Sequence, residues 1–182
     1  MGMRASPTGS IHLDDVRAGP ENLLGGKFEA GGRMAVLEML FGERVALCAM
    51  GVGIMEASLE RAMSYAKERV QFGKPIASFQ AVQLKLARMY ANVQVGRALV
   101  EKAIRMLRAG DADAAFLCAA KYTVSGLAVE VAMDAVQVLG GNGYMREYRV
   151  EMLWRDAKLL EIGGGTSDIQ LLAVARELLK SS

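Results

Sequence analysis

The feature of this sequence that most constrains its fold is a pair of apolar stripes with helical spacing. The first stripe recurs at alternating intervals of three and four residues: Phe79, Val82, Leu86, Met89, Val93, Gly96, Val100, Ala103 and Leu107. The second stripe has the same rhythm: Cys118, Tyr122, Ser125, Val129, Ala132, Val136 and Leu139. Such spacings put side chains on one face of an α-helix. Two long helices that each bury a face need other helices to cover them, so the stripes predict an all-α fold, an antiparallel helical bundle.

A third long helix is expected ahead of these two. Helical periodicity begins near Arg33 and runs to about Val70, with Gly42 as a candidate interruption. The segment Gln71–Pro75 then ends the helix, because proline cannot continue a helix and also restricts the residue before it.

Capping residues mark the other helix ends. Ser78 is the predicted N-cap of the second helix, and Asp111 is the predicted cap of the third. A shorter helix is expected over Val150–Leu160. In the last helix, Ser167 and Gln170 have the spacing of a capping box.

The first 26 residues differ from the rest of the chain. Ser10–Asp14 alternates polar and apolar residues like a short strand and lies between turn signals at Pro7–Gly9 and Gly19–Pro20. A single strand is not stable alone, so this segment is either the tail of a β domain outside the chain or an arm that needs a partner. We therefore predict a remnant of a β domain with its linker at 1–26 and an α-helical bundle domain at 27–182.

Composition argues against several classes of protein. Lys plus Arg numbers 22 and Asp plus Glu numbers 20, so no strong charge points to a nucleic acid or an acidic membrane surface. The most apolar run, Val45–Met55, is too short to span a bilayer, and no secretory signal is visible at the start, which favours a soluble protein. Cys48 and Cys118 form no disulfide framework, which favours a reducing compartment. His12 is the only histidine, so no metal site is expected.

A glycine-rich stretch, Gln137–Tyr144, follows the third predicted helix. Its glycines remove the Cβ atoms that would hold a flat or charged ligand away, and Gln137 offers both a donor and an acceptor. Glycine also simply ends helices, and this stretch alone favours that plainer interpretation. Other motifs in the chain are needed to decide.

Four stretches together resemble the acyl-CoA dehydrogenase family: Arg69–Ile76, Gln137–Tyr144, Arg155–Lys158 and Gly165–Gln170. The resemblance covers about residues 3–180, and its first part is similar to the end of the family's middle β domain. It implies that the bundle is the C-terminal domain of an FAD-dependent enzyme. It also implies a homo-oligomer, a tetramer built as a dimer of dimers, in which FAD is bound partly across a subunit boundary.

Ten residues match positions that contact FAD in the family: Arg69, Gln80, Gln137, Val138, Leu139, Gly140, Gly141, Thr166, Ser167 and Asp168. The physical chemistry agrees with this assignment. An arginine offers a fork of donors to a pyrophosphate, and hydroxyls and free amides at a helix start favour an anion. The alternative for each is plainer: a solvated arginine at a helix end, a glutamine in a first turn, and simple caps.

The sequence departs from the family's commonest pattern at Gly164, where many members carry the catalytic glutamate. A smaller branch, typified by isovaleryl-CoA and long-chain acyl-CoA dehydrogenases, places this glutamate on an earlier helix, just before an arginine. Glu43 and Arg44 match that pattern, 26 positions before Arg69. We therefore predict Glu43 as the catalytic base, with Arg44, Gly164 and Gly165 as substrate-binding residues. The alternative is that Glu43 is a solvated charge on an otherwise apolar helix.

The reaction implied by the resemblance is the α,β-dehydrogenation of an acyl-CoA thioester. The base abstracts the α-proton while a hydride leaves the β-carbon for flavin N5, and the electrons pass to an electron-transfer flavoprotein. The expected location is the cytoplasm, or the mitochondrial matrix in a eukaryote, and the 182-residue chain alone is expected to be inactive. Two alternatives stay open: a catalytically inactive, stand-alone helical interaction or oligomerisation module, and an acyl-CoA oxidase or flavin monooxygenase relative.

Overall fold

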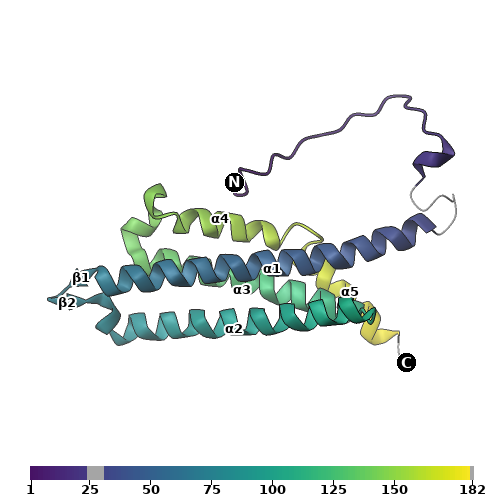
Figure 1. Ribbon diagram of the computed structural model, residues 1–182. Coiled ribbons are helices and arrows are strands. Elements are labelled where there is room, and N and C mark those ends of the chain that lie inside the picture. The colour runs from purple at the N-terminus through teal and green to yellow at the C-terminus, as the bar shows by residue number, and fades with distance from the viewer. Residues whose placement is uncertain (24–30, 181–182) are drawn as a thin grey trace.

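The predicted helical bundle is confirmed by a computed structural model, which describes residues 1–23 and 31–180. Within these residues the helices are α1 (Gly31–Glu68), α2 (Gln80–Ala109), α3 (Ala114–Leu139), α4 (Val150–Leu160) and α5 (Ser167–Leu179). Figure 1 shows α1, α2 and α3 as three long helices that lie side by side with alternating direction. The central helix is α3, which contacts all four of the others.

A tight hairpin joins the first two helices. Strands β1 (Val70–Gln71) and β2 (Lys74–Pro75) pair antiparallel, with Val70 opposite Pro75. The two residues between them, Phe72 and Gly73, have φ values of 51° and 77°. Positive φ at both positions gives the turn whose twist suits a two-residue hairpin. The sequence predicted the end of α1 here but not this pairing.

Short 3₁₀ turns cover Pro20–Asn22, Ile76–Ser78, Gly140–Tyr144 and Arg146–Tyr148. The turn at Ile76–Ser78 makes the prediction of Ser78 as an N-cap wrong. The Ser78 hydroxyl donates a hydrogen bond to the carbonyl of Pro75, 2.7 Å away, and α2 begins two residues later, after Phe79.

Two other capping predictions are displaced by one or two residues. The side chain of Asp113, not Asp111, caps α3 by accepting a hydrogen bond from the Phe116 amide at 3.0 Å. Thr166, not Ser167, caps α5 by accepting from the Ile169 amide at 3.3 Å. In both cases the cap is the polar residue immediately before the first helical residue, as the geometry of a helix start requires.

Two further expectations are corrected. Helix α1 runs through Gly42 without a break, because a single glycine costs a helix only about 1 kcal/mol. The strand expected at Ser10–Asp14 does not form: these residues have no regular secondary structure and are exposed, and no strand lies beside them in the described part of the chain. An unpaired strand has no stability of its own.

The core lies where the helical stripes predicted it. Every residue of the α2 stripe is buried or half-buried, and five are fully buried: Met89, Val93, Gly96, Val100 and Ala103. The α3 stripe is wrong at Tyr122, which is 40% exposed, whereas its neighbour Lys121 is completely buried. Because α3 is central, it buries more than one face and the stripe alone could not show which polar residues turn inward.

The length and composition of the segment Ala114–Tyr144 would also suit a membrane crossing. Half of its most apolar window is buried inside the bundle, as in the core helix of a globular domain.

Candidate active site

A glycine loop between α4 and α5 faces Glu43 of α1. Gly164 and Gly165 have φ values of 62° and 94°, a backbone conformation that other residues rarely adopt. A Cβ atom on Gly164 would lie 2.4 Å from Cδ1 of Leu47 and 3.6 Å from the carboxyl group of Glu43. The Leu47 methyl group thus leaves no room for a side chain at position 164, and the structure brings the predicted base close to Gly164.

Two buried polar side chains hold this loop. Lys121 of α3 donates a hydrogen bond from Nζ to the carbonyl oxygen of Gly165, 2.7 Å away. Gln170 of α5 donates from Nε2 to the carbonyl oxygens of Gly164 and Gly165, at 2.9 and 3.1 Å. Both side chains are 0% exposed. Neither residue was predicted from the sequence, although a lysine directly after the apolar run 114–120 was a signal of a buried polar side chain.

The electrostatics of this region follow from burial. Burial lowers the pKa of Lys121, and the nearby Cys48, Glu161 and Glu43 oppose that shift. Burial also raises the pKa of the Cys48 thiol to about 12, with Lys121 opposing. Lys121 is therefore held next to a thiol that stays protonated at neutral pH.

Arg44 lies beside Glu43 and is half-buried, with its guanidinium 5.6 Å from the ring centroid of Phe41. Its Nε is buried and finds no hydrogen-bond partner among the described residues. A buried guanidinium donor without an acceptor is costly unless a ligand supplies one. Glu43 itself is exposed to solvent.

The start of α5 has fewer free hydrogen-bond donors for an anion than the sequence suggested. The Ser167 amide is not free, because it donates to the carbonyl of Glu161 at 3.0 Å. The Thr166 hydroxyl already serves as the cap of α5. Asp168 lies exposed in the first turn of the helix.

A second group of predicted residues surrounds a hollow of about 400 Å³ at the hairpin end of the bundle. Its lining residues are Tyr65, Arg69, Gln71, Ile76, Val138, Leu139, Gly140, Gly141 and Asn142. No atom lies within 4 Å of the place where a Cβ would be on Gly140 or Gly141, so the backbone here is open to a ligand. Asn142 donates a hydrogen bond to the Tyr65 hydroxyl at 2.9 Å. Gln80 and Gln137 are exposed and do not line the hollow.

The two groups of predicted FAD residues lie far apart in this chain. The 26 residues from Glu43 to Arg69 follow the nearly unbroken helix α1, which at 1.5 Å per residue makes about 39 Å. Figure 1 shows the hairpin and the end of α3 at one end of the bundle and α5 towards the other. Arg69 and the Val138–Gly141 stretch thus form one candidate site, and Thr166–Asp168 lies with Glu43 at another.

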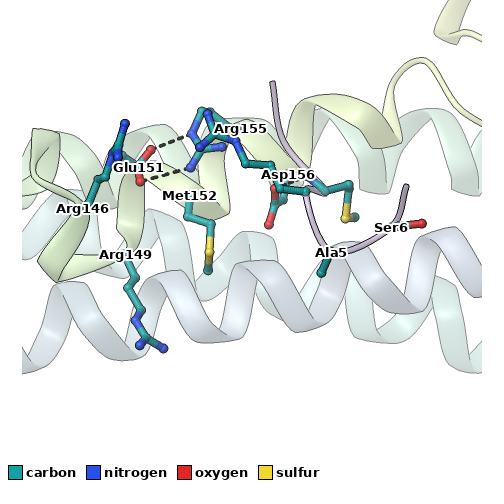
Figure 2. Close-up of a pocket in the computed structure, with 10 residues that line it drawn as sticks. Ala5, Ser6, Arg146, Arg149, Glu151, Met152, Arg155 and Asp156 are labelled. Atoms are coloured by element: carbon teal, nitrogen blue, oxygen red, sulfur yellow. Dashed lines mark hydrogen bonds and ion pairs between the residues drawn. The ribbon is translucent and has the colours of Figure 1, made fainter. Parts of the chain in front are cut away.

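A second hollow, of about 630 Å³, lies between the N-terminal residues and α4 and was not predicted. It is lined by Met3, Arg4, Ala5, Ser6, Arg146, Arg149, Glu151, Met152, Arg155 and Asp156. Figure 2 shows the two hydrogen bonds that join Arg155 to Glu151. These bonds lower the pKa of Glu151. The Met3 amide donates a hydrogen bond to the Asp156 carboxylate at 2.6 Å, and Arg155 donates one to the carbonyl of Met1. Arg155 and Asp156 thus bind the N-terminal residues to α4.

Comparison with known proteins gives matches to one family of enzymes. A family model described as the acyl-CoA dehydrogenase C-terminal domain matches residues 30–179. A probable acyl-CoA dehydrogenase of Bacillus subtilis is 46% identical, over 99% of this chain and 47% of the relative. A mitochondrial isovaleryl-CoA dehydrogenase of Oryza sativa is 40% identical, over 99% of this chain and 44% of the relative. The solved structure of butyryl-CoA dehydrogenase from Megasphaera elsdenii matches with a TM-score of 0.78 and 40% identity, over 82% of this chain and 39% of that one.

These matches place the bundle among the helical domains of flavin-dependent oxidoreductases, because acyl-CoA dehydrogenases are FAD-dependent flavoproteins. The chain belongs to the acyl-CoA dehydrogenase family, and its residues 30–179 correspond to that family's C-terminal domain. The chain spans less than half the length of the curated relatives it matches.

Proposed function

We propose that this chain serves in a flavin-dependent dehydrogenase that oxidises an acyl-CoA thioester between its α- and β-carbons, with Glu43 as the base. The observation that carries the proposal is the Glu43 carboxyl group, which lies 3.6 Å from the point where a Cβ atom of residue 164 would be. The predicted base thus lies beside the backbone of the glycine loop, where we propose that the thioester binds. The family membership supplies the reaction class.

The residues present fit FAD in two places. At the hairpin end, the exposed guanidinium of Arg69 suits a pyrophosphate and the open backbone of Gly140 and Gly141 admits close approach. Gln80 and Gln137, exposed near the same end, are proposed as peripheral contacts. At the other end, Thr166, Ser167 and Asp168 lie beside the glycine loop. Since about 39 Å of helix separates the two groups, we propose that each FAD contacts one group from each of two copies in a homotetramer.

In the proposed reaction Glu43 takes the proton from the α-carbon, and the electrons of that bond form the new double bond as a hydride leaves the β-carbon. FAD, when bound, supplies the acceptor of this hydride. Leu47, one helical turn from Glu43, provides an apolar wall beside the base. Arg44 is proposed to bind the substrate, because its buried Nε has no hydrogen-bond partner among the described residues. The peptide groups of Gly164 and Gly165 are proposed to pass close to the thioester.

The remaining features of the proposal follow from the family. The domain 27–182 would act with a β domain whose last part is residues 1–26, in a protein without a membrane span. The electrons would pass to an electron-transfer flavoprotein. The location would be the cytoplasm, or the mitochondrial matrix in a eukaryote, where the free thiols of Cys48 and Cys118 stay reduced.

The test is the anaerobic bleaching of flavin absorbance by a panel of straight and branched acyl-CoA thioesters, measured in the full-length gene product. Glu43→Gln should keep its flavin and lose about 10²–10⁴-fold in the rate of bleaching. Glu60→Gln is the matched control, an exposed glutamate on the same helix, and should bleach at the wild-type rate. A wild-type rate of bleaching in Glu43→Gln would show that Glu43 is not the base.

Two other outcomes favour other functions. Rapid oxygen consumption by the reduced flavin would favour the acyl-CoA oxidase or flavin monooxygenase relative. If neither the full-length product nor the 182-residue chain retains FAD after gel filtration, the inactive interaction module is the better description.

A further inference from the structure

The glycine loop beside Glu43 is held from behind by two side chains that the reaction itself does not use. Lys121 comes from the N-terminal third of α3 and Gln170 from the start of α5, and both are 0% exposed. Their three hydrogen bonds, between 2.7 and 3.1 Å long, all end on the carbonyl oxygens of Gly164 and Gly165. Two consecutive carbonyl groups of the loop are therefore drawn towards the bundle core.

The hydrogen bonds to these carbonyl groups also fix the direction of the N–H groups in the same two peptide units. In a planar trans peptide the N–H points away from the C=O. Drawing in the carbonyls of Gly164 and Gly165 therefore turns the N–H groups of Gly165 and Thr166 away from Lys121 and Gln170. Neither N–H donates to another described residue. Because Gly164 and Gly165 lack side chains and have positive φ values, little else in the loop enforces this orientation.

A lysine is not the residue that stability alone would favour at position 121. Its burial lowers its pKa, which means that the protein environment disfavours its charge. Methionine has nearly the same length and is equally unbranched, and it would fill this space without the desolvation cost of a cation. Gln170 is similar, since its buried Oε1 has no hydrogen-bond partner among the described residues. Both side chains are thus costly in the fold, and their common contact is the loop.

We propose that Lys121 and Gln170 are positioning residues, which hold the glycine loop 163–165 in the conformation that places Gly164 against Glu43 and Leu47 of α1. Both side chains contact the loop through its backbone carbonyl groups. The inference rests on the proposed function for the meaning of this position, but the contact itself can be tested without it.

The first measurement reports on the loop alone. Hydrogen–deuterium exchange of peptides that cover residues 161–170 is followed in the full-length gene product. The amides of Gly163 and Ser167 are protected there by the carbonyls of Leu159 and Glu161. Lys121→Met should speed their exchange about tenfold or more while leaving the melting temperature unchanged or raised. Gln170→Met should act in the same direction. Lys85→Met, which removes a lysine paired with Asp134 elsewhere in the bundle, should leave the loop unchanged.

The second measurement reports on catalysis. In Lys121→Met, kcat for acyl-CoA oxidation should fall about ten- to a hundredfold, because the loop is displaced beside the base. The KM for the acyl-CoA and the FAD content should stay within about twofold of wild type. If Lys121 had only a structural role, replacing it would lower the melting temperature and leave kcat unchanged. A lower kcat without a lower melting temperature therefore distinguishes a positioning role from a structural one.

The outcomes separate the two proposals. Unchanged exchange in Lys121→Met overturns the positioning role whatever the activity, and a looser loop with unchanged kcat overturns it as well. If the wild-type protein oxidises no acyl-CoA, the proposed function fails, and the exchange measurement still decides whether Lys121 holds the loop.

Discussion

The contact between Gly164 and α1 makes a quantitative prediction for Gly164→Ala. An alanine at φ 62° carries the cost of left-handed backbone, about 1–2 kcal/mol. Its Cβ would also lie 2.4 Å from Cδ1 of Leu47, closer than real Cβ atoms approach. Because Leu47 is half-buried, moving its methyl group should add about 1–3 kcal/mol of overpacking. The expected loss in the free energy of unfolding is therefore about 2–5 kcal/mol.

The assay is urea unfolding of the 182-residue chain, followed by far-ultraviolet circular dichroism. Gly110→Ala is the matched control, because Gly110 has a φ of 70° and no atom within 4 Å of its Cβ position. This control should lose only the backbone part, about 1–2 kcal/mol. The difference between the two variants then measures the contact with Leu47.

A double-mutant cycle completes the test. In a Leu47→Ala background the obstructing methyl group is gone, so Gly164→Ala should cost no more than Gly110→Ala. The two single losses should therefore exceed the loss of the double variant by about 1–3 kcal/mol. An additive cycle, together with equal losses for Gly164→Ala and Gly110→Ala, would refute the placement of the glycine loop against α1.

Two further predictions concern the core and its thiols. Asp134→Asn should lower the free energy of unfolding by about 1–3 kcal/mol, because the Asp134 side chain is only 9% exposed and accepts from Lys85 at 2.6 Å and from Arg88 at 2.9 Å. Arg105→Gln, which breaks an exposed pair with Glu101, should change it by less than about 0.5 kcal/mol in the same urea titration, and equal losses would contradict this account. Burial raises the pKa of Cys48 from 9.0 to about 12. At pH 9 only about one Cys48 thiol in a thousand is then ionised in the native chain, so its alkylation should be about a thousandfold slower in the native chain than in urea. Its rate should rise with pH up to about 12, and a plateau near pH 9 in mass-spectrometric alkylation assays would show that the thiol is not buried as described.

Much of the fold could be predicted from local patterns. The α2 stripe was right at all nine positions, and α4 has the predicted bounds Val150–Leu160. These elements pack one face only, so the spacing of apolar residues describes them fully. The helix starts were less predictable, because several polar residues near each start compete for the capping position. The hydroxyl of Ser78, for example, is already bonded to Pro75.

The candidate site was predictable only where a motif marks it. Glu43 and Gly164 were chosen because their sequence context resembles a known family, and the structure places them against each other. Their catalytic and binding roles stay predictions. Lys121 and Gln170 belong to no such motif, and their contact with the loop joins residues up to 44 positions apart. A periodic pattern shows that a position is buried, but not that a polar side chain there reaches across to a distant loop.

Because α1 is unbroken, it fixes the rotation about the helix axis that separates Glu43 from Arg69. Each residue turns a helix by about 100°, so the 26 steps from Glu43 to Arg69 amount to seven full revolutions and about 80° more. Inserting one residue between them would swing Arg69 about 100° around the helix axis and move it about 1.5 Å along it. Substitutions along this span change only local packing, whereas any change in its length alters the direction in which one end faces relative to the other. The length of this stretch of α1 should therefore be much less free to vary than its composition.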